Sequence, residues 1–105
     1  MIISKTKKPR TSDYNKFLAE RLREPELAAG YLTACMEEGE EAFLLGLKDV
    51  AEAREGMGSL AKAASLNREG LYKMLSENGN PRLSSLAAIL DALGLKLQFS
   101  PKHAA

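Results

Sequence analysis

Two short segments with helical apolar spacing lie almost end to end in the second half of the chain. They cover residues 57–64 and 68–75, and only three residues separate them. A connection this short obliges two helices to cross closely, so the first helix needs a small residue at the crossing, and Ala61 fits. The sequence therefore predicts a helix-turn-helix, with Ser65 at the bend and Leu66 as an apolar plug just after it.

The second of these segments, residues 68–75, has one face suited to the core and one suited to a ligand. Leu71 and Leu75 are spaced to anchor its inner face. Asn67 is a good N-cap, because its side-chain oxygen can accept a hydrogen bond from a free N–H group in the first turn. The outer face then stays free to enter the major groove of DNA, which is wide enough for an α-helix. The pattern therefore predicts a DNA-binding unit.

Helices are also expected over most of the remaining chain. Pro25 suits the first turn of a helix, and Gly39, Gly56 and Gly94 suit helix ends. These signals and the apolar spacing between them predict four further helices, over residues 12–23, 25–38, 40–55 and 83–93. We therefore expect an all-α fold of five to six helices.

The two ends of the chain differ from its middle. Residues 1–11 are polar and basic and contain Pro9, which predicts a flexible arm. The rest, residues 12–105, is expected to form a single helical domain. Its parts are the N-terminal helices (12–55), the helix-turn-helix core (56–94) and a short C-terminal β-strand (95–100).

The strand is predicted from residues 95–99, where apolar and polar side chains alternate strictly. No second segment predicts a strand as clearly, so this one needs a neighbour for its backbone donors and acceptors. That neighbour is its copy in a second subunit, residues 1–5, or another protein, and two of these options imply assembly. If nothing pairs with it, the segment is a frayed extended tail.

Charge is distributed unevenly along the chain, although the net charge is only +1. Residues 1–10 carry four basic and no acidic side chains, residues 11–55 carry five basic and eleven acidic, and residues 56–105 carry six basic and three acidic. This asymmetry suggests two partners of opposite charge. The alternative is an ordinary solvated surface of mixed charge.

Nothing in the sequence predicts an enzyme, a metal centre or a cofactor site. The single histidine, His103, has no candidate catalytic partner, and the single cysteine, Cys35, lies on an apolar helical stripe, as a packing thiol does. The four glutamates around Gly39 have no histidine beside them, which favours a solvated turn or a protein-contact patch over a metal site. One cysteine makes no internal disulfide, and no apolar run approaches the roughly 18 residues of a membrane span, so we expect a cytoplasmic protein without membrane contact.

Six short motifs between residues 56 and 95 identify a family resemblance. They are Gly56-Met57, Leu60-Ala61, Leu66-Asn67-Arg68-Glu69, Leu71-Tyr72-Lys73, Gly79-Asn80-Pro81-Arg82 and Leu90-Asp91-Ala92-Leu93-Gly94-Leu95. With these motifs, residues 56–97 resemble the phage-repressor (Xre-type) helix-turn-helix domain. More narrowly, the chain resembles the small addiction module antidote proteins, which are HigA-like antitoxins of bacterial toxin–antitoxin pairs. Those proteins also carry an acidic helical segment like residues 25–55.

The sequence departs from the wider repressor pattern at two positions. Ser65 stands where that family prefers Gly, and Ser costs about 1 kcal/mol in the left-handed conformation that Gly adopts freely. Gly70 stands inside the second helix, where the family more often has Ser. Gly70 either permits a close approach to DNA or has arisen by drift.

The resemblance implies a lambda-repressor-like fold and a defined function. Such an antitoxin binds double-stranded operator DNA as a homodimer, represses its own operon and neutralises a small basic toxin of the RelE, ParE or HigB type. The acidic segment, residues 11–55, would complement a basic toxin and speed their encounter. Two alternatives remain, a stand-alone helix-turn-helix transcriptional regulator and a protein-only interaction module that has lost DNA binding.

The resemblance also implies which side chains contact DNA. The candidates are Ser59, Asn67, Arg68, Glu69, Tyr72, Lys73 and Arg82. Arg68 is expected to read guanine O6 and N7, and Glu69 to accept from cytosine N4 or to orient Arg68. Lys73 is expected at a base or a phosphate. The remaining polar candidates, Ser59, Asn67 and Arg82, are expected at phosphates, whereas Tyr72 either faces DNA or packs half-buried.

Overall fold

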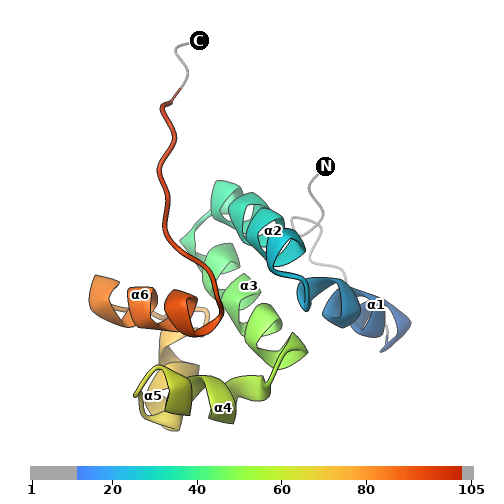
Figure 1. Ribbon diagram of the computed structural model, residues 1–105. Helices are drawn as coiled ribbons and strands as arrows, with labels where there is room; N and C mark the ends of the chain where they lie inside the picture. Colours follow the sequence, from blue (N-terminus) through green and yellow to red (C-terminus); the bar gives the residue numbers. More distant parts are fainter. Residues whose placement is uncertain (1–11, 103–105) are drawn as a thin grey trace.

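The computed structural model describes residues 12–102, and the helices in this part of the chain pack around a central one (Figure 1). They are α1 (Ser12–Leu22), α2 (Pro25–Glu38), α3 (Glu40–Ala53), α4 (Gly56–Ala63), α5 (Arg68–Met74) and α6 (Leu83–Ala92). The all-α fold is thus confirmed. The arm predicted for residues 1–11, and His103, lie outside the described residues.

Helix α3 lies between α1 and α2 on one side and α4 to α6 on the other (Figure 1). A single apolar core runs through all six helices, and its largest fully buried members are Leu22, Leu47, Val50, Leu71, Leu75 and Ile89. Most of these come from the predicted apolar stripes, but in α6 the prediction of Leu83 as an inward residue is wrong: Leu83 is 70% exposed, and Ile89 is fully buried. No helix within residues 12–102 has the length and apolar character needed to cross a membrane.

The helix boundaries follow proline and glycine, with one difference from expectation. Pro25 occupies the first turn of α2, and Gly39, with φ +139°, separates α2 from α3. Helix α3 ends at Ala53, whereas the sequence predicted an end at Glu55 with Gly56 as the stop. Gly56, with φ +91°, is instead the first residue of α4, because its left-handed backbone lets the chain turn directly into the next helix.

Helices α2 and α3 approach each other closely at Gly46. A Cβ atom added to Gly46 would lie 2.8 Å from the Sγ atom of Cys35, which is closer than real contacts allow. Cys35 is buried, which confirms its prediction as a packing thiol. The absence of a side chain at Gly46 is therefore what lets the two helices pack at this distance.

The predicted strand at residues 95–99 is wrong for a single chain, and the described residues contain no strand. Leu95 donates from its backbone N–H to the carbonyl of Leu90, 2.8 Å away, and packs against the core. Beyond it the chain is extended and projects away from the helices (Figure 1), and within residues 12–102 the backbone of residues 96–102 bonds to no other backbone group. A strand needs a neighbouring strand to bond to, and the described part of one chain offers none.

Candidate nucleic-acid interface

The connection between α4 and α5 is a tight turn built on Ser65. Ser65 has φ +59° and is the one residue other than glycine, among those described, with a positive φ. The N–H of Ser65 bonds to the carbonyl of Lys62 (3.1 Å) and the N–H of Leu66 bonds to the carbonyl of Ala61 (2.7 Å). This pair of bonds is the Schellman arrangement that ends helices. The predicted bend at Ser65 and its left-handed backbone are both confirmed.

Leu66 and Asn67 then start α5. Leu66 is half-buried against the core, as expected of a plug after the turn. The side-chain Oδ1 of Asn67 accepts a hydrogen bond from the N–H of Gly70 at 3.0 Å, which confirms Asn67 as the N-cap. This bond uses the side-chain oxygen of Asn67 and not its NH₂ group. The two N–H groups of that amide can therefore still donate to an outside partner.

Helix α5 separates its side chains into two faces. Leu71, together with Leu75 just beyond the helix, is fully buried and fixes the inner face to the core, as predicted. The outer face carries exposed Arg68, Glu69 and Lys73. The core therefore holds the helix while its charged side chains point to solvent.

Tyr72 lies between two cations. The guanidinium carbon of Arg68 and the Nζ atom of Lys48 each lie 5.7 Å from the centre of its ring, and Tyr72 is 37% exposed. Cations at this distance are attracted to the electron-rich face of an aromatic ring. Lys48 belongs to α3 and is not among the residues predicted from the sequence, because only the tertiary fold brings its side chain to the Tyr72 ring on α5.

The seven predicted residues do not all lie in one group. A shallow, open depression is lined by Asn67, Glu69, Gly70, Tyr72 and Lys73, and Arg68 lies against Tyr72 at its edge. Ser59 in α4 and Arg82 at the N-cap of α6 are exposed and lie outside this group. Neither of their side chains has a hydrogen-bond partner within residues 12–102, so both remain available to an outside ligand.

Comparisons with known proteins identify the family. The model of the family described as "probable addiction module antidote protein" matches residues 11–101. This chain belongs to that family. It is also 39% identical over 82 residues to an uncharacterized protein of Haemophilus influenzae, an alignment that covers 77% of this chain and 84% of that protein. No solved structure matches it significantly.

Membership confirms the resemblance found in the sequence. An antidote belongs to a toxin–antitoxin module, and this family membership implies a toxin as partner. Antidotes are generally not enzymes, and no group of three or more His, Cys, Asp or Glu side chains within residues 12–102 is arranged to hold a metal ion.

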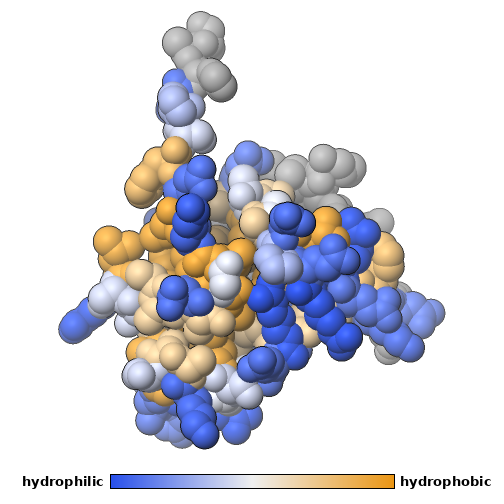
Figure 2. All heavy atoms as spheres, in the orientation of Figure 1, coloured by the Kyte–Doolittle hydropathy of each residue, from blue (hydrophilic) through white to orange (hydrophobic). Residues whose placement is uncertain are grey.

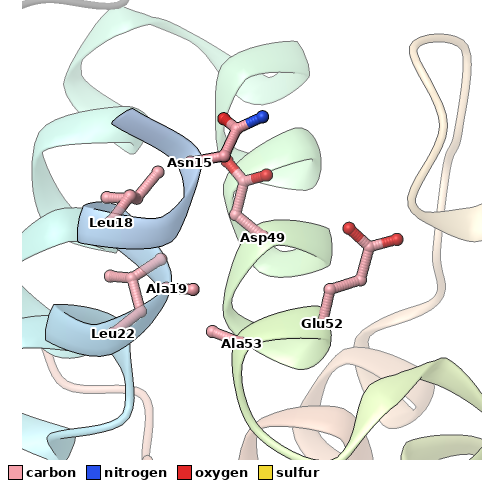
Figure 3. A pocket seen from close by; sticks show the side chains of 7 residues that line it. All are labelled: Asn15, Leu18, Ala19, Leu22, Asp49, Glu52 and Ala53. Carbon is pink, nitrogen blue, oxygen red and sulfur yellow. The ribbon is translucent and has the colours of Figure 1, made fainter. Parts of the chain in front are cut away.

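A second surface of this antidote lies between α1 and α3. Figure 3 shows a groove whose walls are Asn15, Leu18, Ala19, Leu22, Asp49, Glu52 and Ala53. Its lining mixes apolar side chains with polar ones, and the carboxylates of Asp49 and Glu52 come from α3. Oδ2 of Asp49 accepts a 2.6 Å hydrogen bond from the hydroxyl of Tyr31, which holds that carboxylate in place. The groove thus combines apolar side chains with two carboxylates.

Proposed function

We propose that this antitoxin binds double-stranded operator DNA as a dimer, with α4 and α5 forming a helix-turn-helix, and so represses its own operon. The observation that best supports the proposal is that α5 has one buried and one exposed face. Its inner face is buried against the core, while Arg68 on the outer face and Lys48 from α3 each place a cation 5.7 Å from the centre of the Tyr72 ring, and Lys73 on the outer face is exposed. A short, firmly held helix with a cationic outer face suits a DNA major groove.

Each residue of the outer face has a chemical role in this proposal. Arg68 donates two hydrogen bonds to O6 and N7 of a guanine, and Glu69 accepts from cytosine N4 or holds Arg68 in place. Lys73 and Lys48 neutralise phosphates or reach base edges. Ser59, Asn67 and Arg82 donate to phosphate oxygens, which fixes the position of the protein on the duplex.

The distribution of charge supports two separate interfaces. Residues 56–102, which include α4 to α6, carry six basic and three acidic side chains, whereas residues 12–55, which include α1 to α3, carry five basic and eleven acidic. We assign DNA to the first part and a small basic toxin, of the RelE, ParE or HigB type, to the second. The groove between α1 and α3 is the candidate contact for the toxin, because its two carboxylates suit a basic segment and its apolar side chains give that segment a surface to pack on.

Salt dependence tests DNA binding directly. The protein is titrated against a duplex from its own promoter and against a random duplex of equal length, at about 50 and 200 mM salt, because neutralised phosphates release counterions. We expect tighter binding to the promoter duplex and a steep loss of affinity at the higher salt. Equal affinity for both duplexes would support a protein-only interaction module instead.

A charge reversal in the groove tests the toxin assignment. Glu52→Lys places a cation at the rim of the groove, and Glu77→Lys makes the same change in the loop after α5. We expect Glu52→Lys to weaken binding to the toxin encoded beside this antitoxin by roughly 10-fold or more, since like charges across an interface are strongly unfavourable. Equal effects of the two variants would place the toxin contact elsewhere.

A further inference from the structure

The projecting segment after α6 exposes large apolar side chains in an ordered pattern. Leu97 is 44% exposed and Phe99 is 91% exposed. Figure 2 shows apolar atoms at the base of this projecting part of the chain, whereas its outer part is hydrophilic. Lys96 and Gln98 alternate with the two apolar side chains, so an extended backbone places the apolar pair on one side and the polar pair on the other.

The base of the segment is fixed, which gives it a defined starting direction. Gly94 has φ +76°, and its N–H bonds to the carbonyl of Asp91 (3.0 Å), while the N–H of Leu95 bonds to the carbonyl of Leu90 (2.8 Å). These bonds close α6 with a Schellman arrangement, and Leu95 packs against the core. The extended chain therefore leaves the body at one anchored point, and within residues 12–102 no backbone group bonds to the backbone of residues 96–102.

We propose that residues 95–99 pair with the same residues of a second copy of this chain in an antiparallel ladder centred on Leu97. In that register Leu97 faces Leu97, Leu95 faces Phe99, and Lys96 faces Gln98. Every apolar side chain then meets an apolar one, and no charge meets a like charge. The inference rests on the proposed function in one respect, since that function requires two copies on one operator.

Other registers fit the sequence less well. A parallel ladder in register sets Lys96 against Lys96, and like charges directly opposite each other destabilise a sheet. A shift of the antiparallel pairing by one residue sets apolar side chains against polar ones. A shift by two residues sets either Lys96 against Lys96 or Leu95 against Pro101, and proline has no N–H group to donate. The ladder centred on Leu97 avoids all of these conflicts.

Residues 95–99 pair best with a copy of themselves, and this favours a second copy of the chain over residues 1–5 or the toxin as the partner. An antiparallel pair across a two-fold axis uses the same surface on both partners, which is the commonest symmetry of protein dimers. The net charge of +1 per chain opposes the approach of two copies very little. Two strands alone are marginally stable, but here the anchored Leu95 joins each strand to a folded core.

The residue opposite Lys96 decides the register, so Gln98 is the position to change. Gln98→Glu sets a carboxylate against Lys96 at two places in the dimer, whereas Gln98→Lys sets like charges there. From the usual strength of cross-strand pairs, we expect Gln98→Glu to tighten the dimer, and Gln98→Lys to weaken it, by about 2- to 10-fold each. Lys102→Gln is the matched control for Gln98→Glu, because it also lowers the charge by one but lies beyond the ladder, and it should change nothing.

Sedimentation equilibrium of the full chain without DNA measures the dimer constant of each variant. Leu97→Asp sets two carboxylates on the two-fold axis and should leave a folded monomer, because Leu97 lies outside the core. Its melting temperature should match that of the wild type diluted below its dimer constant. A wild-type chain that stays monomeric at about 100 µM, a Leu97→Asp variant that still dimerises, or a Gln98→Glu variant that dimerises more weakly would each overturn the proposal. Either of the first two results would indicate that residues 95–99 pair with residues 1–5 or with the toxin instead.

Titration of the same variants with promoter DNA separates this inference from the proposed function. If the Leu97 and Gln98 variants change self-association as expected but the protein does not bind promoter DNA, the proposed dimer interface stands and the proposed DNA-binding function fails. If the protein binds promoter DNA but substitutions at Leu97 and Gln98 do not change its self-association, the proposed function stands and the proposed dimer interface fails.

Discussion

Arg54 donates a hydrogen bond of 2.6 Å from Nη1 to the carbonyl oxygen of Leu93, a residue 39 positions further along the chain. Nε of Arg54 also lies 3.4 Å from the carbonyl oxygen of Leu22. Leu22 ends α1 and Leu93 caps α6, so one guanidinium group at the end of α3 meets the carbonyl ends of two other helices. Positive charge is favourable at the C-terminal end of a helix, so Arg54 joins the two halves of the fold.

Arg54→Ala should therefore destabilise the fold. We expect a loss of about 2–3 kcal/mol, since two carbonyl groups lose a charged hydrogen-bond donor. Urea unfolding followed by circular dichroism measures this loss. Arg23→Ala is the control, because exposed Arg23 makes a single 3.2 Å bond to the carbonyl of Ala53, and it should cost clearly less. Equal losses would contradict the role of Arg54.

Ser65→Gly should stabilise the protein. Ser65 has φ +59°, where a residue with a side chain is strained, and glycine relieves roughly 1 kcal/mol there. The same substitution at Ser59, inside α4, should destabilise by roughly 0.5 kcal/mol, because glycine is a weaker helix former than serine. Thermal melts of the two variants should shift in opposite directions, and shifts of the same sign would contradict the assigned turn.

Two other glycines should respond to alanine in opposite ways. A Cβ atom at Gly79 would lie 2.0 Å from the carbonyl oxygen of Met74, whereas one at Gly70 would meet only ordinary contacts with Asn67. We expect Gly79→Ala to cost about 2–4 kcal/mol because backbone must move. Gly70→Ala should add about 1 kcal/mol of helix stability.

DNA titration of Gly70→Ala also distinguishes the two explanations for this glycine. Unchanged affinity is the expected result and favours drift. A clear loss of affinity would show instead that the added methyl group blocks a close approach of α5 to DNA.

Lys48 should contribute to DNA binding although it lies on a different helix from the other candidates. Lys48→Gln removes one of the two cations at Tyr72 and should reduce the slope of log affinity against log salt by about 1, as the loss of one phosphate contact does. Lys16→Gln removes the same charge from exposed α1 and serves as the control. An identical slope for Lys48→Gln and the wild type would remove Lys48 from the interface.

Local signals in the sequence predicted the turn between α4 and α5, the start of α5 and its buried face well. The bend at Ser65, the cap at Asn67 and the anchors Leu71 and Leu75 each depend on neighbouring residues, so their spacing was sufficient. Lys48 was missed because its place beside Tyr72 depends on how α3 packs, which no local pattern encodes.

The two errors in the predicted fold also have physical causes. The alternation at residues 95–99 describes a segment suited to pairing, but a strand exists only where a partner supplies hydrogen bonds, and one chain supplies none within its described residues. The end of α3 was placed too late because Gly56 was taken for a stop, whereas its positive φ begins the next helix.

We propose that operator DNA binds to the outer face of α5. The most direct measurement compares the affinity of the wild type for its promoter duplex with that of Arg68→Ala/Lys73→Ala and of Lys16→Ala/Arg21→Ala, which removes the same charges from α1. We expect the α5 variant to bind at least about 30-fold more weakly, since each good base contact contributes roughly 1–3 kcal/mol, while the α1 variant stays close to the wild type. Equal affinities for the two double variants would contradict the claim.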